Sequence, residues 1–67
     1  MTKTVHINGD SHRTEAATIA ALLAELELEP ARLAVEHNRV IAPRSQLDER
    51  PLADGDTLEI VHFVGGG

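Results

Sequence analysis

Alternating apolar and polar side chains predict a β-hairpin at the start of the chain. Residues 3–8 place Val5 and Ile7 on one face, which is the period of a half-buried strand. The pair Asn8-Gly9 follows, and it favours a two-residue hairpin turn because both residues tolerate a positive φ. Residues 10–14 are then predicted to return as a short polar strand, whose composition suits the edge of a sheet.

A helical period replaces the alternation in the middle of the chain. Between residues 18 and 28, apolar side chains recur at i, i+3, i+4 and i+7, which is the stripe of an amphipathic helix: Ile19, Leu22, Leu23 and Leu26. Thr18 is the predicted N-cap. Pro30 is expected to end the segment, because the residue before a proline is driven out of the α region. A helix this short is stable only when one face is buried, so the stripe is predicted to form core.

The second half of the chain returns to the strand period. Residues 32–37 are predicted to form a third strand and 40–42 a fourth, joined by a tight turn at Asn38-Arg39. The polar stretch 45–51 is expected to be irregular or a single helical turn. Two leucines, Leu47 and Leu52, should attach it to the core.

The last predicted strand, residues 57–64, is the longest and most apolar. Leu58 and Ile60 should face the helix, and the alternate positions should face the opposite side, namely Glu59, Val61 and Phe63. One helix cannot cover both faces of a sheet, so these alternate side chains are predicted to be exposed. Phe63 is the chain's single aromatic residue, and its exposure favours a role of this face in docking a partner.

The order strand, strand, helix and three strands predicts an α+β fold, with one mixed sheet packed on one helix. The first and last strands are expected to be central and parallel, because a parallel pair needs a long crossover and the helix supplies one. The folded domain is predicted to span residues 1–64, followed by a flexible glycine tail at residues 65–67.

Composition excludes several classes of function. The formal net charge is −5, which argues against a nucleic-acid partner, since such partners need clustered Lys and Arg. The absence of cysteine removes disulfides, thiolate metal sites and thiol nucleophiles. No apolar run is long enough for a membrane span and no signal peptide is visible, so a soluble cytoplasmic protein is expected. The small size and the acidic surface favour a monomer when the protein is free.

The chain offers little for catalysis by itself. Its four histidines lack ligand partners at metal-binding spacing, and Glu25, Glu27 and Glu29 should fan around the helix as solvated groups. Ser11 and Ser45 have no adjacent base. No bound cofactor or metal is therefore expected, and the chain is interpreted as the substrate of another enzyme.

The reacting group is predicted to be the carboxylate of Gly67. The run Gly65-Gly66-Gly67 has no Cβ atoms, and three extended residues reach roughly 10 Å. Such a narrow arm suits entry into a partner's active site. A carboxylate becomes a good electrophile when ATP converts it to an acyl-adenylate, so the partner should be an ATP-dependent enzyme.

Several short motifs, in order along the chain, resemble the ThiS family of sulfur carriers in thiamin biosynthesis. They are Thr18-Ile19-x-x-Leu22-Leu23, Ala34-Val35-Glu36-x-Asn38, Pro43-Arg44, Leu52-x-x-Gly55-Asp56-x-x-Glu59-Ile60-Val61 and Val64-Gly65-Gly66-Gly67. The similarity runs from Val5 to Gly67. Ala42 stands where the family more often has valine.

This resemblance implies a β-grasp, ubiquitin-like fold. It also implies that a ThiF-like adenylyltransferase, using ATP and magnesium, activates Gly67. A cysteine desulfurase or a rhodanese-like protein would then supply sulfur for a C-terminal thiocarboxylate, and thiazole synthase, ThiG, would accept it.

Two other interpretations of the sequence stay open. The small subunit of molybdopterin synthase, or a carrier for another pathway, shares the terminal diglycine and the same activation. A β-grasp interaction module with an inert tail has a different function altogether. The roles of Arg39 and Arg44, contact with a partner or solvation of turns, are also left open by the sequence.

Overall fold

The computed structural model describes residues 1–63, so the predictions for Val64 and for the tail at 65–67 lie outside the described residues. The elements are β1 (Lys3–Ile7), β2 (Asp10–Thr14), α1 (Ile19–Glu25), the short 3₁₀ helix η1 (Pro30–Arg32), β3 (Leu33–His37), β4 (Val40–Ile41), a second 3₁₀ helix η2 (Arg44–Gln46) and β5 (Thr57–His62).

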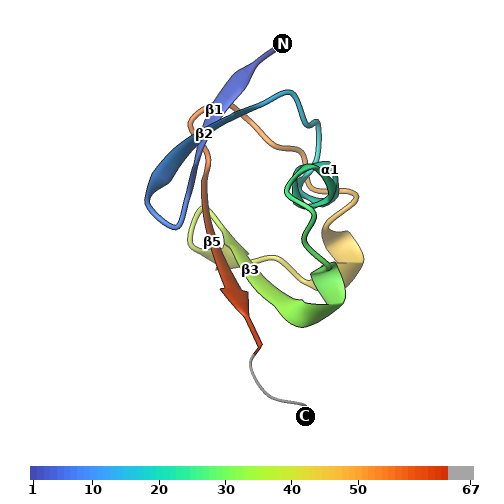
Figure 1. Ribbon diagram of the computed structural model, residues 1–67. Helices are drawn as coiled ribbons and strands as arrows, with labels where there is room; N and C mark the ends of the chain where they lie inside the picture. Colours follow the sequence, from blue (N-terminus) through green and yellow to red (C-terminus); the bar gives the residue numbers. More distant parts are fainter. Residues whose placement is uncertain (64–67) are drawn as a thin grey trace.

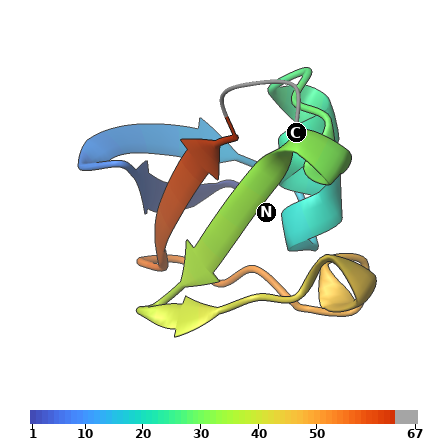
Figure 2. The same cartoon turned by 90° about the horizontal axis from the view of Figure 1, so that it is seen from below.

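The five strands form one mixed sheet in the order β2-β1-β5-β3-β4. β1 and β5 run parallel, with His6 opposite Thr57 and Ile7 opposite Leu58, and the other neighbouring strands are antiparallel. Figures 1 and 2 show α1 on one side of the curved sheet. The predicted α+β class, the central parallel pair and the polar edge strand β2 are all confirmed.

The core lies between the sheet and α1 and is entirely aliphatic. It joins the inward faces of the strands to the helix stripe and to the loop after β4; its largest fully buried side chains are Val5, Ile19, Leu22, Leu23 and Leu58. Leu47 and Leu52 are 3% and 4% exposed, which confirms that they attach the loop to the core.

The helix is shorter than its hydrophobic pattern predicted. Thr18 is the N-cap as expected, and its Oγ1 accepts a bond of 3.1 Å from the Ala21 amide. At the other end, however, the Leu28 amide donates to the Leu23 carbonyl and the Glu27 amide to the Ala24 carbonyl. Those two bonds are a Schellman motif. The prediction that the helix reaches residue 28 is wrong, since Glu27 has φ of +60° and Pro30 comes too late to be the stop.

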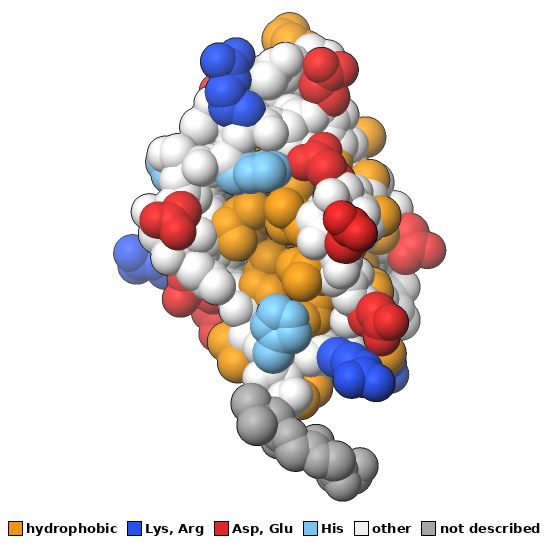
Figure 3. Space-filling view, in the orientation of Figure 1, with side chains coloured by type: hydrophobic (Ala, Val, Ile, Leu, Met, Phe, Trp, Pro, Cys, Tyr) orange, Lys and Arg blue, Asp and Glu red, His pale blue; other side chains and the backbone are white. Residues whose placement is uncertain are grey.

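The leucines beyond the helix end still pack inward. Leu26 and Leu28 are half-buried against the core, which explains why the helical spacing continued past the last helical residue. In the orientation of Figure 1, Figure 3 shows an apolar area with histidine side chains above and below it and carboxylates to either side. Within residues 1–63, no helix is long and apolar enough to cross a membrane.

Asn8 ends the pairing between the two central strands. It lies in the β1–β2 turn with φ of +50°. Its side-chain amide forms the two hydrogen bonds to β5 that the backbone of one more β1 residue would form. Its Oδ1 accepts from the Ile60 amide at 2.7 Å, and its Nδ2 donates to the Ile60 carbonyl at 3.0 Å. Beyond Ile60, β5 is therefore paired on the β3 side, where His62 lies opposite Leu33 and the Phe63 amide donates to the Arg32 carbonyl.

Candidate docking face and its supports

The face of the sheet opposite α1 carries the residues predicted for docking. Leu58 and Ile60 are buried, whereas Val61 is 59% and Phe63 65% exposed. Glu59 is also exposed. The predicted alternation along β5 is confirmed, and Phe63 is not covered by any described loop. The terminal glycines predicted to react, Gly65 to Gly67, follow this strand but lie outside the described residues.

Neighbouring strands extend the apolar part of this face. Ala34 lies opposite Val61 in the register of β3 and β5, and it is exposed. Ile41, on the edge strand β4, lies opposite Glu36 and is 72% exposed. We call the exposed set Ala34, Ile41, Glu59, Val61 and Phe63 the docking face. An apolar patch with a charged margin is typical of a protein-binding surface.

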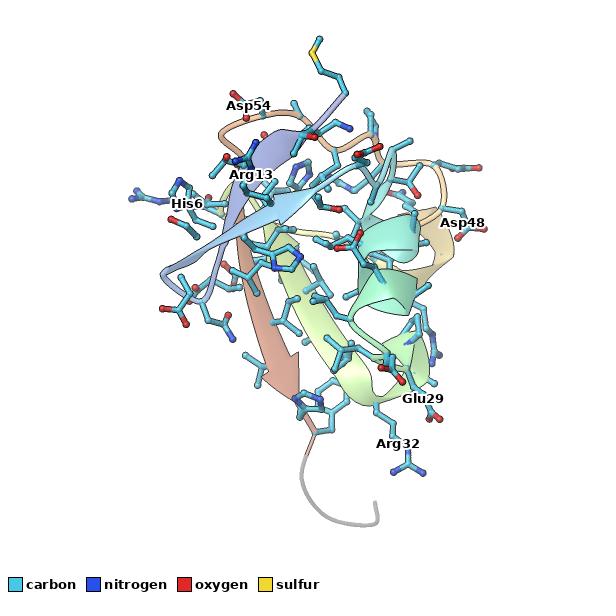
Figure 4. The ribbon with its side chains drawn as sticks, turned by 45° about the horizontal axis from the view of Figure 1, so that its top comes forward. His6, Arg13, Glu29, Arg32, Asp48 and Asp54 are labelled. Carbon is cyan, nitrogen blue, oxygen red and sulfur yellow. The ribbon has the colours of Figure 1, made fainter. Side chains whose placement is uncertain are left out.

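A hollow of about 430 Å³ lies on the same side of the sheet, toward its other end. Its lining includes the charged side chains of Glu36, Arg39 and Glu59, together with His6 on β1. Figure 4 shows His6 directed away from the side that α1 covers. Glu36 and Glu59 lie directly opposite each other on β3 and β5, a cross-strand pair of like charges that destabilises the sheet slightly.

A polar cluster beside this hollow fixes the loop that leads into β5. Asp56 Oδ2 accepts bonds from His37 Nε2 at 2.6 Å and from the Ala53 amide at 2.9 Å, and Asp56 Oδ1 accepts from Asn38 Nδ2 at 3.1 Å. The side chains of His37 and Asp56 are each 12% exposed. Burial alone raises the pKa of the Asp56 carboxyl, but these bonds from His37, Ala53 and Asn38 outweigh it and hold the pKa below its usual value.

A second polar cluster ties β2 to the helix end. Glu25 accepts bonds of 2.9 Å from His12 Nε2 and from Thr14 Oγ1, and these bonds lower the pKa of the Glu25 carboxyl. Thr14 is buried, and its Oγ1 also accepts from the Ala16 amide. Glu25 is exposed, as expected of a solvated group, but the two side-chain hydrogen bonds that it accepts were not predicted from the sequence. The bonding partners are more than ten positions apart, so no local motif reveals them.

The described residues contain no group of three or more His, Asp or Glu side chains arranged to hold a metal ion. The exposed pair Arg32 and Glu29 is joined at 3.3 Å, with both side chains at least 75% exposed; Figure 4 shows it near the end of β5. An ion pair this exposed contributes little to stability. Arg44 is exposed at the start of η2.

Comparison with known proteins gives a consistent result. The model of the ThiS family matches residues 2–67. The chain is 44% identical over 55 residues to the sulfur carrier protein ThiS of Bacillus subtilis, covering 82% of this chain and 83% of that protein. The crystal structure of the thiamine biosynthesis protein ThiS from Geobacter metallireducens superposes with a TM-score of 0.80 and 28% identity, covering 96% of this chain and 99% of that one.

A larger relative matches over one part only. The chain is 39% identical over 64 residues to the thiazole synthase of Magnetococcus marinus. This match covers 94% of the chain but 20% of that protein, so the chain spans about a fifth of its length.

Proposed function

Because this chain belongs to the ThiS family, we propose that it carries sulfur for thiamin biosynthesis as a thiocarboxylate on Gly67. The observation that supports this most directly is the family match over residues 2–67, which includes the three glycines. Similarity to a named sulfur carrier over most of both chains supports the same assignment.

The proposed chemistry begins with activation by a partner enzyme. A carboxylate oxygen of Gly67 attacks the α-phosphorus of ATP, pyrophosphate leaves, and an acyl-adenylate forms. A persulfide, supplied by a cysteine desulfurase or a rhodanese-like protein, then attacks the carbonyl carbon and AMP leaves. Reduction of the new sulfur–sulfur bond by a thiol leaves the thiocarboxylate. ATP and its magnesium belong to the ThiF-like partner, and a partner that uses ATP fits a cytoplasmic location.

The division of labour between body and tail follows from energetics. Fixing the backbone of a glycine segment in one conformation costs about 1–2 kcal/mol per residue. Binding of the folded body must offset that cost, and we assign this task to the docking face, with Val61 and Phe63 as apolar anchors and Glu59 at the charged margin. β5 joins the two functions, because its outward residues form the face and its end leads into the tail.

Thiazole synthase is the proposed sulfur acceptor. A thiazole synthase contains a segment 39% identical to nearly all of this chain. A carrier-like segment within the acceptor itself indicates that the two parts work together, and by analogy we propose that the separate carrier binds its acceptor through the docking face. The free carrier is proposed to be a monomer.

Intact mass spectrometry tests the proposal. The chain is incubated with ATP, magnesium, the ThiF-like enzyme of the same organism and a sulfide source. The expected result is a mass increase equal to the replacement of one oxygen by sulfur, absent when Gly67 is deleted or when one residue is added after it. A chain that forms neither adenylate nor thiocarboxylate, with an unchanged circular dichroism spectrum, would favour an interaction module with an inert tail.

A further inference from the structure

The two hairpins of the sheet share one turn conformation but differ at its second residue. In the β1–β2 turn, Asn8 has φ of +50° and Gly9 +89°; in the β3–β4 turn, Asn38 has +52° and Arg39 +70°. Two-residue turns with positive φ at both positions favour Asn-Gly, because glycine has no Cβ to clash with the backbone. Arg39 therefore occupies, at some conformational cost, a position for which the same chain uses glycine in its other hairpin.

The β3–β4 turn is held by Asn38 rather than by the Arg39 side chain. The Asn38 amide donates to the Thr57 carbonyl at 2.8 Å, and Asn38 Oδ1 accepts from the Thr57 amide at 2.9 Å. Within residues 1–63, the basic side chains that form ion pairs are His12, Arg32 and His37. The Arg39 guanidinium therefore has no ion-pair partner among these residues. Strain by itself does not mark a function, since Glu27 also has a positive φ; at Arg39 the strained backbone carries an exposed side chain that lines the hollow beside the docking face.

The guanidinium is placed where a partner would meet it. Arg39 is exposed and lines the hollow of about 430 Å³ together with Glu36 and Glu59. The hollow adjoins the docking face, and Glu59 belongs to both. Arg39 thus places a cation next to two carboxylates at the margin of the docking face.

We propose that Arg39 is a specificity residue that pairs with a carboxylate on the protein bound to the docking face. The inference rests on the proposed function and takes the adenylating enzyme as that protein. A carboxylate fits better than a phosphate group, because Glu36 and Glu59 beside Arg39 repel a doubly charged group more strongly. The net charge of −5 attracts partners with basic surfaces in general. The Arg39 cation on the surface of this chain disfavours any partner, or any orientation of a partner, that places a cation opposite it.

The decisive variant is Arg39→Gly, which restores the favoured Asn-Gly turn and removes the guanidinium. We expect its Tm to rise by about 4 °C, as relief of local strain does in a domain of this size. We expect the KM for the carrier in ATP–pyrophosphate exchange by the adenylating enzyme to rise about tenfold, with kcat unchanged, as for the loss of one charge pair at an interface. Arg39→Lys keeps the charge but loses the two-pronged geometry, so its KM should lie between the two.

Glu27→Gly is the matched control, because Glu27 is also a charged non-glycine residue at positive φ and follows α1, the helix that covers the opposite side of the sheet from the docking face. It should raise the Tm to a similar extent and leave the KM unchanged. An unchanged KM for Arg39→Gly, or a fall in its Tm, would overturn the inference about Arg39. Failure of the unaltered chain to be adenylated at all would instead overturn the proposed function, and the inference with it.

Discussion

Replacement of Asp56 by alanine is expected to bring the fold close to its stability limit. The carboxylate accepts three hydrogen bonds, from His37, the Ala53 amide and Asn38. The His37 bond is short and largely shielded from water, since both side chains are 12% exposed. Through these bonds Asp56 connects the end of β3, the β3–β4 turn and the loop before β5.

The size of the loss follows from these contacts. A neutral hydrogen bond contributes about 1 kcal/mol net and one to a charged group about 1.5–3 kcal/mol, and a buried donor left without its acceptor costs further free energy. Part of the loss is regained where water reaches the cavity, so Asp56→Ala should lower the free energy of unfolding by about 3 kcal/mol. A domain of this length has about 3–10 kcal/mol in total.

Urea unfolding followed by far-ultraviolet circular dichroism measures this difference, because the chain contains no Trp or Tyr for fluorescence. Asp48→Asn is the control: Asp48 is exposed, and Figure 4 shows it on the far side of the molecule from His6. A loss below 1 kcal/mol for Asp56→Ala, or a loss equal to that of the control, would refute the reasoning.

The same cluster predicts the effect of pH. The pKa of Asp56 is lowered in the folded state, so its contribution is complete above the unfolded-state pKa of about 3.9. That contribution is lost as the pH falls through the folded-state value. The stability difference between the unaltered chain and Asp56→Asn should therefore be constant near neutrality and shrink below about pH 4.

Three further perturbations test other parts of the fold. Asn8→Ala should cost about 2 kcal/mol, since it removes both bonds to Ile60 and a residue suited to positive φ; amide hydrogen exchange at Ile60 should accelerate, and an unchanged rate would contradict this role. Leu23→Ala, at a fully buried position, should cost about 2–5 kcal/mol in urea unfolding, and a cost under 1 kcal/mol would mean that the core refills the space. Because the pKa of Glu25 is lowered in the folded state, its carboxylate contributes to the stability of the unaltered chain and this contribution is lost on acidification. Glu25→Gln should remove it, and identical curves of unfolding free energy against pH for the two chains would contradict this role.

The parts of the fold that could be predicted from the sequence are those that depend on the local periodicity of apolar and polar residues. Val61 and Phe63 are exposed because strand residues alternate and one helix covers one face, and both facts follow from the order of apolar and polar residues alone. The family resemblance is confirmed by the match over residues 2–67.

Long-range polar contacts could not be found in that way. His37 and Asp56 are 19 positions apart, and Asn8 and Ile60 are 52 apart, so nothing in either local pattern marks them as partners. The end of α1 was misplaced for a different reason. Leu26 and Leu28 remain apolar because they pack on the core, and packing requires the same side chains whether or not the backbone is still helical.

Because β5 is the central strand of the sheet, the chain cannot complete its fold without this strand, which directly precedes the tail. β1 and β2 form a local hairpin, but β1 gains its second neighbour, and β3 its long partner, only when β5 is present. Contacts that close such long loops form late in folding. During synthesis, then, the sheet cannot be completed until β5 has left the ribosome. A chain cut within β5 loses the middle of its sheet and is open to proteolysis, so cells would hold few folded chains that lack this strand.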